Sequence, residues 1–148
     1  VSPEKIQTAL KSFENMEGRQ EIYEKNGFTI IQDCYNAGPE SMTAALMVLG
    51  KKKGRRIAVL GDMLELGEDS LQEHISVIEK ASVSGADMIC LVGGEFAKAL
   101  EAVEAEGMLH FNTSDELAKW IEDAGIDGAV VLIKGSRGTR MEKVVEKL

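Results

Sequence analysis

The segment KGSRGTR (residues 134 to 140) places Lys134 and Arg137 on either side of Ser136, among glycines. It overlaps the end of the apolar run AVVLIKG (129 to 135), so these side chains would lie at a junction between a strand and a helix. Ammonium and guanidinium groups in such a loop bind carboxylates and phosphates. The pattern is neither the phosphate-binding loop GxxxxGK[ST] nor the hydrolase motif GxSxG. We predict an anion-binding loop; the alternative is an ordinary turn with solvated basic side chains.

Two acidic residues are expected at the ends of other strands. Asp62 directly follows the apolar run IAVLG (57 to 61), and Asp33 ends the run GFTIIQD. In open parallel sheets, ligands bind beyond the carboxyl ends of the strands. A carboxylate there often accepts a hydrogen bond from a ribose hydroxyl, although Asp also favours turns for local reasons. Asp62 and Asp33 are therefore candidate ligand-binding residues.

The remaining reactive side chains do not form a known site. His74 and His110 stand without an HExxH motif or a carboxylate cluster, so we expect no metal site built by the protein. Cys34 and Cys90 lack the spacing of a metal clip and are interpreted as reduced thiols. We expect His74 to be a partly exposed histidine on a helix. The loop VGGEF lacks the third glycine of a dinucleotide fingerprint.

Strands and helices alternate along the chain, which positions these loops. The Asn26-Gly27 pair predicts a tight turn between two strands in RQEIYEKNGFTIIQD. Continuous apolar strands separated by helices are typical of a parallel sheet that is buried on both faces. We predict an α/β fold, Rossmann-like, with three layers, a mostly parallel sheet and an N-terminal β-hairpin. The further strands are expected at 57–61, 88–93, 108–111 and 129–135, and the helices at 3–13, from Pro39, 69–83, 95–105, 113–123 and 137–147.

Other conspicuous side chains have a structural interpretation. Trp120 and four of the methionines are expected in the core. The basic run at 51–53 with Arg55 and Arg56 is expected to be a solvated exit from the helix that begins at Pro39. The methionines are Met42, Met47, Met63 and Met88.

Composition limits the partners. The 148 residues, 44% of them hydrophobic, suffice for one folded domain. The net charge of −8 argues against nucleic acid and against an anionic membrane as the main partner. No apolar run approaches the roughly 20 residues of a membrane-spanning helix, so we expect a soluble, intracellular protein. The first residue is Val1 rather than Met, so we expect a processed chain or a piece of a longer protein.

Four segments of the sequence occur in a distinctive order: GR (18 to 19), DCYNAGPESM (33 to 42), GRRIAVLGDMLELGEDS (54 to 70) with His74 downstream, and LIKGSRGTRME (132 to 142). This succession resembles the C-terminal domain of the Mur ligase family. GDMLELG and KGSRG are typical of the branch that joins D-alanyl-D-alanine to UDP-N-acetylmuramoyl-tripeptide, a peptidoglycan precursor. The DNPR-type motif of a sister branch, which reads meso-diaminopimelate, is absent. The resemblance implies that residues 1–17 end a central domain or form a linker and that residues 18–148 are the C-terminal domain.

The resemblance also implies an activity and its partners. It implies an ATP-dependent amide ligase of three domains, which forms an acyl phosphate on the tripeptide and then joins the dipeptide. ATP and Mg²⁺ would be bound mainly by a central domain with a phosphate-binding loop; this chain contains no GKT or GKS and is expected to be inactive alone. The implied partners are the two substrates and the N-terminal and central domains, with no nucleic acid and no membrane insertion, in the bacterial cytoplasm.

The resemblance assigns four residues to ATP. Arg19 and Asp33 would hold the nucleotide from across the cleft between domains. Tyr35 and Asn36 would lie in the loop that approaches the ATP phosphates.

Four other residues match the segments that face the incoming dipeptide. Asp62 with its loop, and Lys134, Ser136 and Arg137, would face the carboxylate of D-alanyl-D-alanine. Lysine and arginine suit that carboxylate on physical grounds as well.

The chain departs from the family pattern at two positions. Cys34 stands where the family usually has Ser, and Gly38 where it has Asn; neither replaces a charged ligand. Two other interpretations stay open: a stand-alone Rossmann-like regulatory module that binds a nucleotide or a small acid, and a response-regulator-like or flavodoxin-like signalling domain. The signalling domain fits less well, because it needs an acidic cluster at strand ends with a phosphorylatable aspartate and a downstream lysine.

Overall fold

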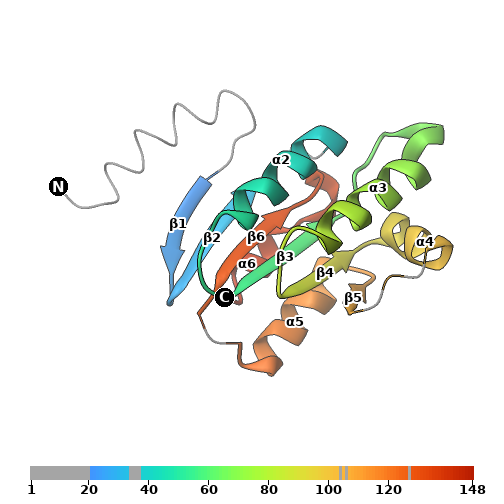
Figure 1. Ribbon diagram of the computed structural model, residues 1–148. Coiled ribbons are helices and arrows are strands. Elements are labelled where there is room, and N and C mark those ends of the chain that lie inside the picture. The colour runs from blue at the N-terminus through green and yellow to red at the C-terminus, as the bar shows by residue number, and fades with distance from the viewer. Residues whose placement is uncertain (1–20, 34–37, 104, 106, 127) are drawn as a thin grey trace.

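The computed structural model describes residues 21–33, 38–103, 105, 107–126 and 128–148. The helix predicted at 3–13 lies outside these residues. Figure 1 shows a central sheet with α2, α3 and α4 side by side on one face and α5 on the opposite face. This is the three-layer α/β architecture expected from the alternation of strands and helices.

The described strands form one six-stranded sheet in the order β1-β2-β6-β3-β4-β5. β1 pairs with β2 in antiparallel fashion, and every other pair of neighbours is parallel. The predicted fold class, with its N-terminal hairpin, is confirmed. The strands are β1 (Glu21–Lys25), β2 (Phe28–Asp33), β3 (Arg56–Gly61), β4 (Met88–Val92), β5 (Met108–Phe111) and β6 (Val130–Lys134).

The hairpin turn has the geometry that its sequence predicts. Asn26 has φ of 50° and Gly27 has φ of 87°. Two consecutive positive φ angles make the turn whose twist matches that of two adjacent antiparallel strands, and Asn-Gly adopts it with little strain. The turn therefore pairs Lys25 with Phe28 and sets the register of the hairpin.

Helices cover both faces of the sheet because its strands carry apolar side chains on both faces. Within β3, Ala58 and Leu60 point to one face, whereas Ile57 and Val59 point to the other. The first face is covered by α2 (Pro39–Gly50), α3 (Ser70–Ser82) and α4 (Gly94–Ala102), and the second by α5 (Ser114–Ala124) and α6 (Glu142–Val145).

Helix α2 has one apolar face that is buried and an opposite face that is exposed. Met42, Ala45, Leu46 and Leu49 recur at helical spacing and are buried against the sheet. Met47 lies off this apolar face and is 61% exposed, so its predicted place in the core is wrong. The predictions for Met42 and Met63, both buried, are confirmed, whereas Met88 and Trp120 are half-buried against the core.

The C-terminal segment differs from the single helix predicted at 137–147. It forms a 3₁₀ turn at Arg137–Thr139 and then the short helix α6. Arg140 between them has a φ of 53°, which a continuous helix cannot contain. The break turns Met141 into the core, where it is fully buried, so tertiary packing overrides the local helical pattern.

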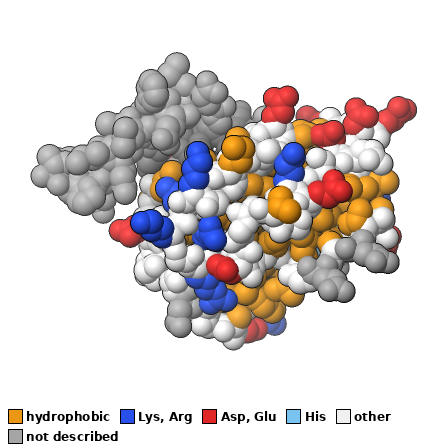
Figure 2. Space-filling model, viewed as in Figure 1, with side chains coloured by type: hydrophobic (Ala, Val, Ile, Leu, Met, Phe, Trp, Pro, Cys, Tyr) orange, Lys and Arg blue, Asp and Glu red, His pale blue; other side chains and the backbone are white. Residues whose placement is uncertain are grey.

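The basic run after α2 is mostly exposed, as predicted, but Arg56 has a structural role. Its Nη1 donates to the Gly50 carbonyl oxygen at 2.7 Å, which satisfies a carbonyl at the end of α2. Figure 2 shows that Lys and Arg side chains gather toward the left of the visible face, while Asp and Glu side chains follow its upper edge. No described helix has the length and apolar character needed to cross a membrane.

Candidate functional site

Two loops that follow neighbouring strands are joined at the carboxyl edge of the sheet. One follows β3 and begins at Asp62; the other follows β6 and contains Ser136. The Ser136 amide donates to the Asp62 carbonyl oxygen at 3.1 Å, and the Leu64 amide donates to Ser136 Oγ at 2.8 Å. Ser136 therefore binds the first loop through both its backbone and its side chain.

Glycines make this close approach possible. Gly61 and Gly135 end or follow the adjacent strands β3 and β6. A Cβ atom at Gly135 would lie 2.7 Å from Met141 Cγ and 2.8 Å from Thr139 Oγ1, and one at Gly61 would meet the same two side chains. Real side chains cannot be accommodated at such distances without a shift of the neighbouring chain. Glycine at both positions thus leaves room for the Thr139 and Met141 side chains.

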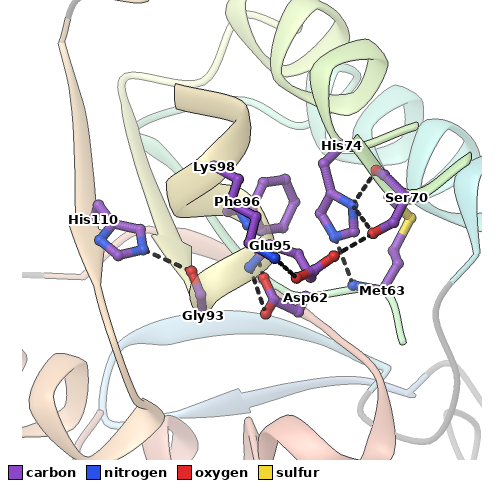
Figure 3. A network of polar contacts seen from close by, with 9 residues as sticks. All are labelled: Asp62, Met63, Ser70, His74, Gly93, Glu95, Phe96, Lys98 and His110. Atoms are coloured by element: carbon purple, nitrogen blue, oxygen red, sulfur yellow. Dashed lines mark hydrogen bonds and ion pairs between the residues drawn. The ribbon is translucent and has the colours of Figure 1, made fainter. Parts of the chain in front are cut away.

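Asp62 holds the start of helix α4. Its Oδ2 accepts from the Glu95 amide and its Oδ1 from the Phe96 amide, each at 3.0 Å, and the residue is 6% exposed (Figure 3). Its negative charge complements the positive end of the helix dipole. Both carboxylate oxygens thus contact the helix, and Gly93, with φ of 115°, leaves the space that they occupy.

His74 is fully buried, so the expectation of a partly exposed histidine is wrong. Its Nε2 accepts a hydrogen bond from the Met63 amide at 3.0 Å, and its Nδ1 lies 2.7 Å from the Ser70 carbonyl oxygen (Figure 3). The ring also packs edge-on against Phe96, with centroids 4.6 Å apart. A side chain on α3 is therefore joined to the loop after β3.

The first residue of α3 is also linked to α4. Ser70 Oγ donates to Glu95 Oε1 at 2.6 Å, and Lys98 Nζ donates to Glu95 Oε2 at 3.2 Å (Figure 3). The hydrogen bond from Ser70, followed by that from Lys98, lowers the pKa of Glu95 below its usual value. Glu95 therefore stays ionised as an acceptor at neutral pH.

The strand register places the other predicted residues along the same edge. Lys134 is the last residue of β6, opposite Asp33 on β2 and Leu60 on β3. The Lys134 side chain is 1% exposed. Arg137 begins the 3₁₀ turn that follows. The edge thus brings Asp62, Lys134 and Ser136 together on two adjacent strands and their loops.

Three predicted nucleotide-binding residues lie outside the described residues, so their place remains a prediction. They are Arg19, Tyr35 and Asn36.

The sequence did not indicate the role of the VGGEF loop in the hydrogen bonds that join Asp62, α3 and α4. Its glycines suggest only an incomplete dinucleotide fingerprint, whereas Gly93 makes room for Asp62 and Glu95 binds both Asp62 and Ser70. The available signal was an apolar strand followed by two glycines and an acidic residue, which is typical of a helix N-terminus held by backbone hydrogen bonds.

The described residues contain no group of three His, Cys, Asp or Glu side chains that could hold a metal ion. Cys90, in the middle of β4, is buried, and burial raises the pKa of its thiol to about 12. It is therefore a core residue and not a nucleophile at neutral pH.

Comparisons with known proteins agree with the sequence motifs. Residues 18–137 match the family model described as "Mur ligase, glutamate ligase domain". The chain is 37% identical over 121 residues to the UDP-N-acetylmuramoyl-tripeptide–D-alanyl-D-alanine ligase of Escherichia coli (strain K12), and 30% identical over 155 residues to that of Bacillus subtilis (strain 168). These alignments cover 80% and 100% of the chain but only 26% and 34% of the relatives. The chain thus spans about a third or less of their length.

Solved structures show the same relationship in three dimensions. The MurF ligase from Thermotoga maritima, crystallised with ADP, matches with a TM-score of 0.74 and 32% identity over 88% of this chain and 30% of that chain. MurF from Acinetobacter baumannii matches with a TM-score of 0.78 and 35% identity over 100% of this chain and 33% of that chain. These matches, together with the fold, show that the chain belongs to the Mur ligase family, as the C-terminal domain of a MurF-type ligase.

Proposed function

We propose that the chain is the part of an ATP-dependent ligase that completes the site where D-alanyl-D-alanine is joined to UDP-N-acetylmuramoyl-tripeptide. The observation that carries this proposal is the pair of loops joined by Ser136 at the carboxyl edge of the sheet. It is supported by relatives at 30% to 37% identity whose names specify those substrates. Residues 18–148 would form this domain, and residues 1–17 would connect it to the central domain.

The reaction has two steps. A carboxylate oxygen of the tripeptide attacks the γ-phosphorus of ATP, so that ADP leaves and an acyl phosphate forms. The amine of the dipeptide then attacks the acyl carbon, phosphate leaves, and the amine loses its proton to the surroundings. Positioning and charge neutralisation account for most of the catalysis in phosphoryl transfers. This domain can contribute both without providing a catalytic base.

For the nucleotide, we propose contacts from Arg19 and Asp33, with Tyr35 and Asn36 near the phosphates. Asp33 ends β2 at the same edge as Lys134, which is the position expected of a nucleotide ligand in this type of sheet. The crystallisation of the Thermotoga maritima relative with ADP supports a nucleotide in the ligase. Mg²⁺ would be bound mainly by the central domain of the longer protein.

For the dipeptide, we propose that Lys134 and Arg137 supply positive charge for its carboxylate. The Lys134 ammonium is buried at the end of β6, where a charge acts through a lower dielectric than in water. Ser136 holds the two loops together, and Asp62 fixes the first loop on α4. Asp62 would thus contribute by fixing the loop's conformation.

The remaining parts of the proposal concern the whole protein. The domain would close over the cleft as a lid, through a hinge before Arg19, as in other enzymes that exclude water during transfer. The ligase would act in the bacterial cytoplasm, and the 148-residue chain alone would be inactive. The gene sequence upstream of Val1 tests this arrangement. A phosphate-binding loop encoded there would support it, whereas a natural start at Val1 would contradict it.

Steady-state kinetics of the full-length protein test the assignment of sites. Lys134→Ala and Arg137→Ala should raise the KM for D-alanyl-D-alanine more than that for ATP, and Arg19→Ala and Asp33→Ala should do the reverse. Arg55→Ala, which removes an exposed basic side chain from the opposite edge of the sheet, is the matched control. If all four variants show wild-type KM values for both substrates, the assignment is wrong.

A further inference from the structure

The loop after β3 is held at two successive backbone amides by side chains from other elements. The Met63 amide donates to His74 Nε2 at 3.0 Å, and the Leu64 amide donates to Ser136 Oγ at 2.8 Å. One side chain comes from α3 and the other from the loop after β6. The conformation of the loop therefore depends on both contacts, not on its own sequence alone.

The contacts of His74 determine its protonation pattern. A backbone amide can only donate, so Nε2 must carry a lone pair toward Met63. A carbonyl oxygen can only accept, so Nδ1 must carry the proton that points to Ser70. Only the neutral imidazole with its proton on Nδ1 satisfies both. Full burial and the edge-on contact with Phe96 keep the ring in that orientation (Figure 3).

We propose that His74 is a positioning residue for the dipeptide site. By accepting the Met63 hydrogen bond, it holds the loop that begins at Asp62 against the Ser136 loop, where the dipeptide carboxylate would bind. The inference rests on the proposed function. His74 touches no substrate and acts through the backbone, so its effect should fall on dipeptide binding and spare ATP.

Two amide substitutions separate this role from simple packing. The Gln side chain can place its carbonyl oxygen near the position of Nε2, so His74→Gln keeps an acceptor for Met63. The shorter Asn reaches only the position of Nδ1, so His74→Asn keeps a donor for Ser70 and loses the Met63 contact. Both remove the ring from Phe96, so each variant is the control for the other.

The test is steady-state kinetics of the full-length ligase with both variants. His74→Asn should raise the KM for D-alanyl-D-alanine about tenfold, the effect of one lost hydrogen bond in a buried site, with the KM for ATP within about twofold of wild type. His74→Gln should recover most of the dipeptide KM. Hydrogen exchange read by mass spectrometry should be faster for the peptide that contains Met63 and Leu64 in the Asn variant than in the Gln variant.

The outcomes distinguish the two proposals. A wild-type ligase that does not join D-alanyl-D-alanine overturns the proposed function and, with it, the positioning role of His74. An active wild-type enzyme whose Asn variant keeps its dipeptide KM overturns the role of His74 alone. Equal losses in the Asn and Gln variants, on both substrates and in thermal stability, also overturn it, because the ring and not the Nε2 contact would then matter.

Discussion

The hydroxyl oxygen of Ser136 accepts a hydrogen bond from the Leu64 amide at 2.8 Å, although 72 positions separate the two residues. Ser136→Ala leaves that amide without its acceptor in a part-buried place. We expect the free energy of unfolding of the variant to be about 1–2 kcal/mol lower than that of the wild type. Urea titrations of the 148-residue chain measure this difference. The control is Ser82→Ala, since the exposed Ser82 bonds only within its own helix. Equal stability of the two variants would contradict the structural role of Ser136.

The cap formed by Asp62 gives a second prediction. In Asp62→Ala the Glu95 and Phe96 amides at the start of α4 lose their acceptors, and we expect a loss of about 2 kcal/mol in the free energy of unfolding. Asp69→Ala is the matched control, because Asp69 precedes α3 and makes no side-chain cap hydrogen bond. Chemical denaturation monitored by circular dichroism measures the free energy of unfolding of both variants. A smaller decrease for Asp62→Ala than for Asp69→Ala would refute the capping role of Asp62.

Adjacent glycines at the start of α4 allow a paired experiment. A Cβ at Gly93 would overlap the Asp62 carboxylate, and its φ of 115° disfavours any other residue. At Gly94 a Cβ would meet nothing within 4 Å. We expect Gly93→Ala to lower the melting temperature by several degrees and Gly94→Ala to leave it nearly unchanged. The comparison fails if calorimetry finds similar melting temperatures for the two variants.

Cys90 gives a prediction about chemical reactivity and pH. Burial raises the pKa of its thiol to about 12 from 9.0, so the folded protein should resist iodoacetamide at pH 8, whereas the urea-unfolded chain should react. Because the pKa is raised on folding, its contribution to stability is complete below pH 9.0 and is lost as the pH rises toward 12. Mass spectrometry of the peptide that contains Cys90 measures the alkylation. Rapid labelling of that peptide in the folded state would show that the thiol is accessible.

Local patterns in the sequence were enough to predict the hairpin, the mostly parallel sheet and most helices. Asn26 and Gly27 adopt their turn for reasons contained in two residues. Long-range packing was not predictable in the same way. Arg140 breaks the last helix because Met141 has a buried position to fill, and no periodicity near it indicates this.

The candidate site shows the same division. The apolar runs before Asp62 and Lys134 correctly predicted that both lie at the carboxyl ends of strands. The direction of the Asp62 carboxylate was not predictable, because its partners are amides more than 30 positions away. His74 likewise binds an amide 11 positions before it, in a loop whose path depends on the rest of the fold.

The place of β6 in the sheet has a consequence for how the chain is made. This strand is the last of the six in sequence, yet it lies between β2 and β3, and its pairings with them are the sheet's connection between the N-terminal hairpin and the other three strands. Until residues 130–134 leave the ribosome, the hairpin and the β3-β4-β5 unit have no common partner. Contacts between segments so far apart form late and slowly. The ribosome must therefore release nearly the whole domain before the edge that carries Asp62, Lys134 and Ser136 can form.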